Sequence, residues 1–172
     1  AAEAAAAHGK VNLVFNNAGV SVTGPADQLR YEDFHWLMNI NFWGVVHGSR
    51  AFLPYIREAG EGHIVNTSSV FGLFGVPSQS AYNASKFAVK GFTDALRVEL
   101  DGEPIVVSCV MPGGVKTSIV ARSRYRPADN RAPTREEAAL RFQQLAALTP
   151  DQAAVQIMAG VARCRSRILV GR

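Results

Sequence analysis

Tyr82 and Lys86 are the two side chains of this sequence whose types and spacing best suit proton transfer. They lie four residues apart in a segment whose helical pattern begins at Ala81, so that on a helix they share one face. A neighbouring cation favours the phenolate form of a tyrosine, whose unperturbed pKa is about 10. We therefore expect Lys86 to lower the pKa of Tyr82 and to make it a proton donor or acceptor near neutral pH.

The residues before this helix place a hydroxyl group beside the tyrosine. His63–Thr67 is an apolar, β-branched run after Gly62, which predicts a short buried strand. Ser68 and Ser69 follow at its carboxyl end, where open α/β sheets place their chemistry. One of these serines could hold a reacting oxygen against the phenol of Tyr82. The alternative is that the pair forms only a turn or a helix cap.

These residues together resemble the active site of the short-chain dehydrogenase/reductase family, in which a serine is followed thirteen residues later by a tyrosine and four residues further on by a lysine. The thirteen-residue spacing selects Ser69, and not Ser68, as the partner of Tyr82. Further segments resemble the family in the family's order: Asn16–Gly19 (NNAG), Asn41–Gly44 (NFWG) and Pro112–Thr117 (PGGVKT). The resemblance covers nearly the whole chain and is strongest over roughly residues 1–120.

The resemblance implies a Rossmann-type α/β fold with a doubly wound parallel sheet. The hydrophobic pattern predicts strands over residues 11–15, 63–67, 105–111 and 167–170. It predicts helices over residues 1–8, 31–39, 40–58, 81–100, 134–148 and 150–163. Thr134 and Glu137 predict a capping box, and Pro54 is expected to kink the helix that contains it. The polar residues 118–133 are expected to form a loop long enough to act as a lid.

The family fold normally opens with a strand, a glycine-rich turn and a helix that hold the cofactor pyrophosphate. No G-x-x-x-G-x-G precedes the strand at residues 11–15, and no residue that would choose NAD over NADP is recognisable. We therefore expect residues 1–172 to form a single NAD(P)-binding Rossmann-type domain that is incomplete at the N-terminus and at the C-terminus. On this interpretation only the C-terminal two-thirds of the fold is present.

The resemblance also assigns roles to four catalytic residues. It makes Tyr82 the acid or base, Lys86 the residue that lowers its pKa and holds the nicotinamide ribose, and Ser69 the hydrogen-bond donor to the substrate oxygen. It makes Asn41 part of a proton relay that links Lys86 to solvent through a water. The alternative for Asn41 is a residue at a helix start with local hydrogen bonds only.

The resemblance implies NAD or NADP as the cofactor and a small-molecule carbonyl or alcohol as the substrate. The residues that would contact the cofactor are Asn17, Ala18, Gly19, Tyr82, Lys86, Pro112, Gly113, Val115 and Thr117. The residues expected to form the substrate site are Ser69, Val70, Phe71, Phe74 and Gln79. Because these are mostly apolar, a hydrophobic or small uncharged carbonyl is favoured over a sugar phosphate.

The function implied is hydride transfer between nicotinamide and a carbonyl or secondary alcohol carbon, with the cofactor supplying the hydride chemistry. Two alternatives stay open. The chain could be a non-catalytic scaffold or regulatory protein of the same fold, or an epimerase or dehydratase that uses the same tyrosine and lysine.

The composition is that of a globular α/β protein. Of the 172 residues 48% are hydrophobic and 19% are charged, and the formal net charge is +4. This apolar content excludes a disordered chain, and the modest charge, much of it in residues 122–141 and 163–172, predicts basic patches and no nucleic-acid surface.

Several further expectations follow from residue usage. No stretch is long enough for a membrane span, and two cysteines without a disulfide framework indicate a reducing cytosol, so we expect a cytoplasmic protein. The histidines lie on separate elements, which predicts no metal site: His8, His35, His47 and His63. The resemblance implies a homodimer or homotetramer formed through the helices at residues 41–58 and 81–100. The alternative is that the apolar residues of these helices belong only to the intramolecular core.

Overall fold

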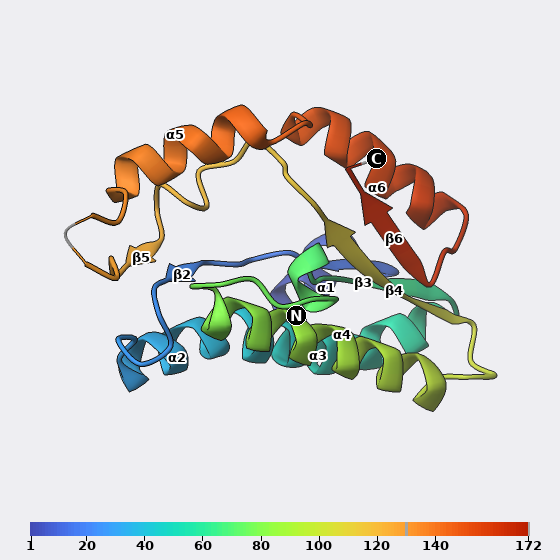
Figure 1. Cartoon of the computed structure of the whole chain (residues 1–172). Helices are drawn as coiled ribbons and strands as arrows, with labels where there is room; N and C mark the ends of the chain where they lie inside the picture. Colours follow the sequence, from blue (N-terminus) through green and yellow to red (C-terminus); the bar gives the residue numbers. More distant parts are fainter. Residues whose placement is uncertain (130, 172) are drawn as a thin grey trace.

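The central element is a four-stranded parallel sheet in the order β1-β3-β4-β6 (Figure 1). The computed structural model describes residues 1–129 and 131–171. The strands are β1 (Leu13–Asn16), β3 (Gly62–Thr67), β4 (Ile105–Pro112) and β6 (Arg167–Val170). All four predicted strands are therefore present, within one or two residues of the predicted bounds at most ends. Parallel neighbours need crossover connections, and helices provide them, which confirms the predicted Rossmann-type α/β architecture.

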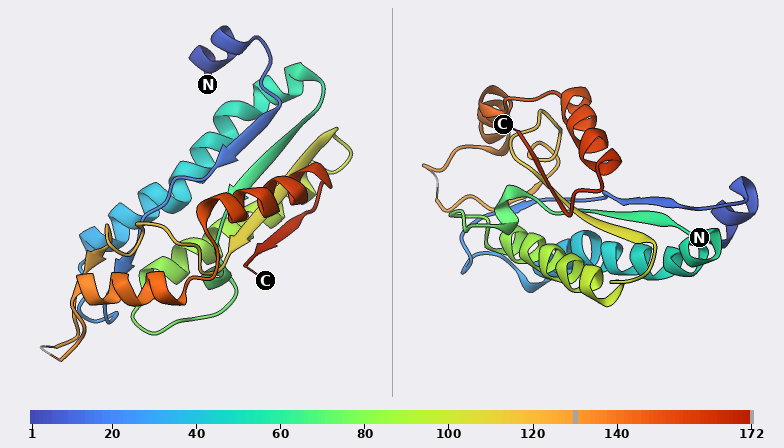
Figure 2. Two further views of the ribbon diagram at one scale, coloured as in Figure 1. Left: turned by 90° about the horizontal axis from the view of Figure 1, so that it is seen from above. Right: turned by 90° about the vertical axis from the view of Figure 1, so that its right-hand side faces the viewer.

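Helices cover both faces of this sheet (Figures 1 and 2). On one face lie α3 (Gly44–Ala59) and α4 (Ser80–Glu99), and on the other α6 (Pro150–Ala162) packs against β6 and β4. The core is accordingly split. Ile64 of β3 packs on the α3 and α4 side, whereas its neighbour Val65 packs on the α6 side, and both are fully buried. Burial on both faces explains why β3 and β4 read as continuous apolar runs.

Two capping boxes fix the helices that follow β4. In α5 (Arg135–Leu145) the Thr134 hydroxyl accepts from the backbone N–H of Glu137, and the Glu137 carboxylate accepts from the N–H of Thr134, as the sequence predicted. In α6 the same pair of bonds joins Thr149 and Gln152. Helix α3 continues through Pro54 to Ala59 and ends at Gly60, whose φ of 88° is left-handed.

Two helical segments in the N-terminal half differ from regular, packed α-helices. Helix α1 (Ala2–His8) buries no residue and projects from the body (Figure 2). Helix α2 (Tyr31–Met38) runs into α3 through a π-helical turn, η1 (Asn39–Trp43). Single π-helical turns inside helices are frequent at functional sites, and this one contains Asn41.

Residues 118–133, predicted as a loop, contain a strand. β5 (Arg124–Tyr125) pairs in parallel with β2 (Val22–Thr23), so that Val22 lies opposite Arg124. The sequence did not predict a strand within this loop, because two-residue strands carry too little periodicity to be recognised. Figure 1 shows this pair between α2 below and α5 above, beside the main sheet.

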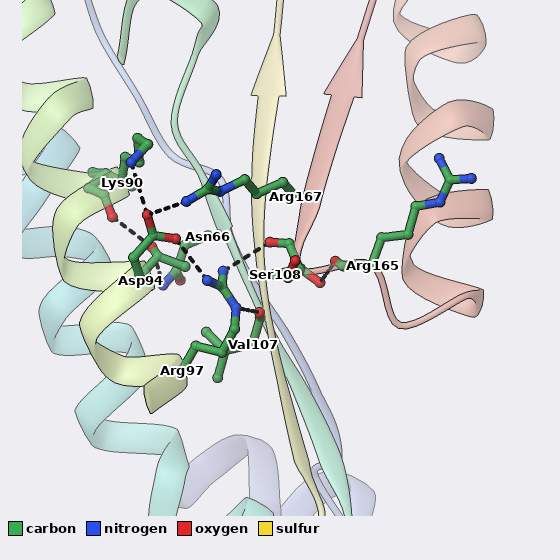
Figure 3. A network of polar contacts seen from close by, with 11 residues as sticks. Asn66, Lys90, Asp94, Arg97, Val107, Ser108, Arg165 and Arg167 are labelled. Carbon is green, nitrogen blue, oxygen red and sulfur yellow. Dashed lines mark hydrogen bonds and ion pairs between the residues drawn. The ribbon is translucent and has the colours of Figure 1, made fainter. Parts of the chain in front are cut away.

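An ion cluster around Asp94 ties α4 to β6 (Figure 3). The carboxylate of Asp94 pairs with Lys90 Nζ at 2.9 Å, Arg97 Nη1 at 2.8 Å and Arg167 Nη2 at 3.1 Å. Arg97 also donates to the carbonyl oxygens of Val107, from its Nε, and Ser166, from its Nη2. Burial alone would raise the pKa of Asp94, but the bonds from Arg97, Lys90 and Arg167 lower it to about 2.

This low pKa predicts a loss of stability in acid. The folded pKa lies below the ordinary value of 3.8, so the contribution of Asp94 is complete above about pH 4 and is lost as the pH falls toward 2. We expect Asp94→Asn to lower the free energy of unfolding at pH 7 by about 1–2 kcal/mol, allowing for partial exposure. Urea unfolding at pH 7 and between pH 4 and 2 measures this. Asp101→Asn, at an exposed position after α4, is the control. Equal losses in the two variants would contradict the prediction.

Strand β1 is an edge of the main sheet. Leu13 and Phe15 alternate with buried Val14 and are each 41% exposed. Exposed apolar edge strands promote pairing between chains, so a polypeptide of these 172 residues alone should form concentration-dependent associates larger than a dimer or tetramer. Phe15→Lys should reduce this association in light scattering, whereas Tyr31→Lys, a change at an exposed aromatic residue on α2, should not. A monodisperse unmodified polypeptide would contradict the prediction.

Within residues 1–129 and 131–171, no helix combines the length and the apolar character that a membrane crossing would require.

Candidate active site

The four residues predicted as catalytic meet at the carboxyl end of β3. Ser69 is the second residue after that strand, Tyr82 and Lys86 lie in the first two turns of α4, and Asn41 lies in η1. The amino group of Lys86 lies 5.6 Å from the centre of the Tyr82 ring. A Cβ atom placed on Gly19 would lie 3.5 Å from both Lys86 Nζ and Asn41 Oδ1, so these two polar groups flank the same glycine.

Asn41 is fully buried and connects the loop after β1 to α4. Its Oδ1 accepts from the backbone N–H of Val20 at 2.8 Å, and its Nδ2 donates to the Val20 carbonyl at 3.0 Å and to Ser85 Oγ at 3.1 Å. Ser85 in turn donates to the carbonyl of Tyr82 at 2.8 Å. The alternative of a helix-start residue with only local hydrogen bonds was therefore wrong, because these partners lie 21 and 44 residues away.

Lys86 is a buried cation, 3% exposed. Its Nζ donates to the Thr67 carbonyl at the end of β3 at 3.1 Å, and an ammonium group has three N–H donors. Burial lowers the pKa of Lys86 to about 8. The backbone around it is fixed as well, since Ser68 Oγ donates to the Lys86 carbonyl at 2.7 Å.

The prediction that Lys86 lowers the pKa of Tyr82 was wrong. Burial raises the pKa of Tyr82 above its ordinary value, and the neighbouring hydroxyl of Ser69 acts in the opposite direction. The physical reason is that Lys86 lies over the face of the ring and directs a hydrogen bond at Thr67, so that the loss of solvent around the phenol dominates.

Ser69 lies between Tyr82 and the end of β4. It is 8% exposed, its Oγ donates to the Pro112 carbonyl at 3.4 Å, and it accepts from the N–H of Phe71 at 3.1 Å. The latter bond caps the short 3₁₀ helix η2 (Val70–Gly72). Ser69 therefore caps this short helix, which is the role that the alternative interpretation gave to the serine pair. Its hydroxyl also lies beside the phenol of Tyr82.

The residues predicted to form the substrate site lie on the segment after Ser69. Phe71 packs edge-on against both Tyr82 and Phe74, with ring centres 6.0 Å apart in each pair. Val70 belongs to η2, whereas Gln79 is turned toward β2, where its Nε2 donates to Thr23 Oγ1 at 3.0 Å.

Asn83, which the sequence reasoning missed, fixes this segment. Its Nδ2 donates to the carbonyls of Phe71 at 2.6 Å and Phe74 at 2.8 Å, and its Oδ1 accepts from the N–H of Val76 at 3.0 Å. The sequence signal was an asparagine in the first turn of the predicted helix, directly after a loop. Asparagine side chains in such positions often bond the backbone groups of the neighbouring loop.

Gly72 is required at its position in this segment. A Cβ there would come within 2.8 Å of the Lys86 carbonyl and would also overlap Ser68 Oγ. The close approach of the segment to α4 therefore depends on the glycine.

The residues predicted to contact a cofactor border the same edge of the sheet. Asn17 accepts at its Oδ1 from Thr67 Oγ1 at 3.2 Å, and Ala18 and Gly19 follow it. Pro112 ends β4 beside Val170 of β6, and the N–H of Gly113 donates to the Val170 carbonyl at 2.8 Å. Further along, Val115 pairs with Leu148 and the Thr117 carbonyl accepts from Gln143 of α5.

A buried polar network behind the site was also missed. Asn16 Nδ2 donates to Asn66 Oδ1 at 2.8 Å and to Ser49 Oγ at 3.1 Å, and Asn66 Nδ2 donates to Thr93 Oγ1 at 3.1 Å. These bonds join β1, β3, α3 and α4 directly beneath the catalytic edge. The sequence signal was Asn66 itself, a polar residue inside an apolar strand, which must find partners when buried.

Comparison with known proteins identifies the class to which this fold and site belong. The sequence profile of the family described as short chain dehydrogenase matches residues 1–128, about as far as the sequence resemblance predicted. The chain belongs to the short-chain dehydrogenase/reductase family.

Particular relatives are similar over part of their own length. SadH of Mycobacterium tuberculosis, provisionally named an oxidoreductase, is 44% identical over 99% of this chain and 62% of its own. A 3-ketodihydrosphingosine reductase of Bacteroides thetaiotaomicron is 42% identical over 63% of this chain and 40% of its own. A short chain dehydrogenase/reductase from Burkholderia phymatum, solved in complex with NAD, is 37% identical with a TM-score of 0.84 over 98% of this chain and 64% of its own. The chain thus spans less than two thirds of these proteins.

Proposed function

We propose that this protein is an NAD(P)-dependent oxidoreductase that transfers a hydride between nicotinamide and a carbonyl or secondary alcohol carbon. The observation that carries the proposal is the meeting of Ser69, Tyr82, Lys86 and Asn41 at one sheet edge from separate parts of the chain. A buried lysine beside a partly buried tyrosine is costly to keep without a function or a complete set of partners.

The residues present fit a nicotinamide cofactor. Lys86 is buried and has N–H donors beyond the one given to Thr67, which suits a pair of ribose hydroxyls. Asn17, Ala18 and Gly19 would lie along the adenosine side, and Pro112, Gly113, Val115 and Thr117 would lie at the nicotinamide. When bound, the cofactor supplies the hydride. The choice between NAD and NADP stays open.

Tyr82 would transfer the proton. In the reducing direction its phenol donates a proton from Oη to the substrate oxygen, and a high pKa keeps that proton in place until negative charge develops on the oxygen. The Ser69 hydroxyl would donate a hydrogen bond to the same oxygen and stabilise its developing charge. Lys86 would hold the ribose hydroxyls of the nicotinamide, and Asn41 would complete a proton relay to solvent through a water.

The substrate would be a hydrophobic or small uncharged carbonyl compound. Val70, Phe71 and Phe74 give the segment beside Tyr82 an apolar character, and Phe71 packs directly on the Tyr82 ring. The name of the Bacteroides relative, a reductase of a keto compound, agrees with carbonyl reduction.

A spectrophotometric assay tests this proposal. The complete protein, incubated with NADH or NADPH and a panel of ketones and aldehydes, should oxidise one of the two cofactors only when a carbonyl compound is present. Absence of turnover with every carbonyl compound, and also with NAD or NADP and every secondary alcohol, would favour the non-catalytic alternative.

We also propose a homodimer or homotetramer formed through α3 and α4, which both lie below the sheet in Figure 1. Large apolar side chains on these helices and η1 reach the surface, with exposed fractions of 45% for Trp43, 45% for Phe87 and 76% for Val98. Val98→Glu should shift the complete protein toward a smaller species in analytical ultracentrifugation, and Val155→Glu on α6 provides a comparison at a second exposed valine. An unchanged sedimentation coefficient for Val98→Glu would contradict this use of α4.

A further inference from the structure

The segment around β5 carries arginines that the proposed reaction does not use. Arg124 and Arg126 lie on either side of Tyr125, so the period of two places their side chains on one side of the extended segment. Arg122 in the preceding turn reaches the same cavity, and so does Arg135 at the start of α5.

Two of these arginines are held in place by a buried carboxylate. The side chain of Asp33 on α2 is 2% exposed and accepts from Arg124 Nη1 at 3.1 Å and Arg126 Nε at 3.2 Å. Burial alone would raise the pKa of Asp33, but the bonds from Arg126 and Arg124 hold it below its ordinary value. The Arg124 guanidinium also stacks 4.0 Å above the Trp36 ring. This fixed geometry orients the two guanidinium groups before any ligand arrives.

The positive charge here exceeds what pairing within the chain requires. An open cavity of about 630 Å³ is lined by Trp36, Arg122, Ser123, Arg124, Tyr125, Arg126, Arg135 and Glu136. Four arginines thus face two carboxylates, since Asp33 joins Arg124 to Arg126 and Glu136 pairs with Arg135 at 3.0 Å. Each carboxylate neutralises one guanidinium group, so four arginines and two carboxylates leave a surplus of about two positive charges at the cavity. Such a surplus attracts an anion.

We propose that this cavity binds a phosphate group carried by a small organic molecule, at a site whose lining includes none of the four residues proposed for hydride transfer. A phosphomonoester carries about −1.5 to −2 charges at pH 7, which matches the surplus, and its oxygens accept the forked donors of arginine. The volume exceeds that of a lone phosphate and falls within the range of small-molecule sites. The indole of Trp36 gives the organic part an apolar surface.

Isothermal titration calorimetry with phenyl phosphate tests this site in the complete protein at low ionic strength. We expect saturable binding, which Arg122→Gln should weaken about tenfold or more because Arg122 supplies part of the surplus positive charge. Arg122 is exposed, so its replacement should leave the fold intact. Arg163→Gln removes the same charge from an exposed position after α6 and should leave the affinity unchanged. Benzoate, a monoanion of similar shape, should bind more weakly than phenyl phosphate.

Three results would overturn the proposal. They are the absence of saturable phenyl phosphate binding, equal weakening by Arg122→Gln and Arg163→Gln, and benzoate binding as tight as that of phenyl phosphate. None of them depends on turnover, so the outcome is independent of the proposed reaction.

Discussion

Tyr82→Phe in the complete protein is expected to lower kcat by about 10³-fold or more while the affinity for the cofactor stays within about threefold of the original. The change removes one oxygen, and with it the proton that Tyr82 would exchange with the substrate, and positioned acid–base groups contribute about 10²–10⁴-fold. The aromatic ring remains and keeps its edge-on contact with Phe71, so the packing of the site should survive. Steady-state turnover and fluorescence titration of the cofactor measure the two quantities.

Tyr31→Phe is the matched control for this change. Tyr31 is 83% exposed at the start of α2, so the same loss of a hydroxyl there should leave kcat unaltered. Near-normal turnover in Tyr82→Phe would reject Tyr82 as the acid or base.

Ser69→Ala is expected to slow the reaction by about 10²-fold or more, the effect of removing one hydrogen-bond donor to a developing oxyanion. The free energy of unfolding should fall by about 1 kcal/mol, because besides its contact with Tyr82 the Ser69 hydroxyl makes a long bond of 3.4 Å to Pro112 and the cap at Phe71.

Ser68→Ala separates this catalytic effect from a structural one. Ser68 is 2% exposed and its Oγ bonds the Lys86 carbonyl at 2.7 Å. Its loss should lower the free energy of unfolding by about 1 kcal/mol and reduce kcat only a few-fold. If Ser68→Ala slowed turnover more than Ser69→Ala, the register inferred from the thirteen-residue spacing would be wrong.

The fold was largely predictable because its signals are local. The apolar runs of β3 and β4 reflect burial on both faces, and the hydroxyl of Thr134 with the carboxylate of Glu137 marks the start of α5 within one turn. Such patterns depend on neighbouring residues only, so they can be recognised in a single sequence.

The supporting residues of the site were not predictable in the same way, because their partners lie far away in the chain. Asn41 bonds Val20 and Ser85, and Asn66 bonds Asn16 and Thr93, over separations of 21 to 50 residues. A single sequence indicates that such an amide must be satisfied if it is buried, but not which group satisfies it.

The pKa of Tyr82 shows a second limit. The spacing of Tyr82 and Lys86 was read correctly as one helix face, but the direction of the shift depends on burial and on where the ammonium group points. Neither is encoded in the four-residue spacing. Likewise, β5 became recognisable only through its pairing with β2, which lies about a hundred residues earlier.

Transfer of label from a deuterated cofactor tests the central claim most directly. The complete protein is incubated with NADH or NADPH that carries deuterium at both C4 positions of the nicotinamide, together with a carbonyl compound that it turns over, and the product is examined by mass spectrometry. We predict deuterium on the new alcohol carbon, with the label nearly absent from the same incubation of Tyr82→Phe. An alcohol product without deuterium, or a substrate rearranged with no net oxidation of the cofactor, would contradict hydride transfer between nicotinamide and a carbonyl carbon.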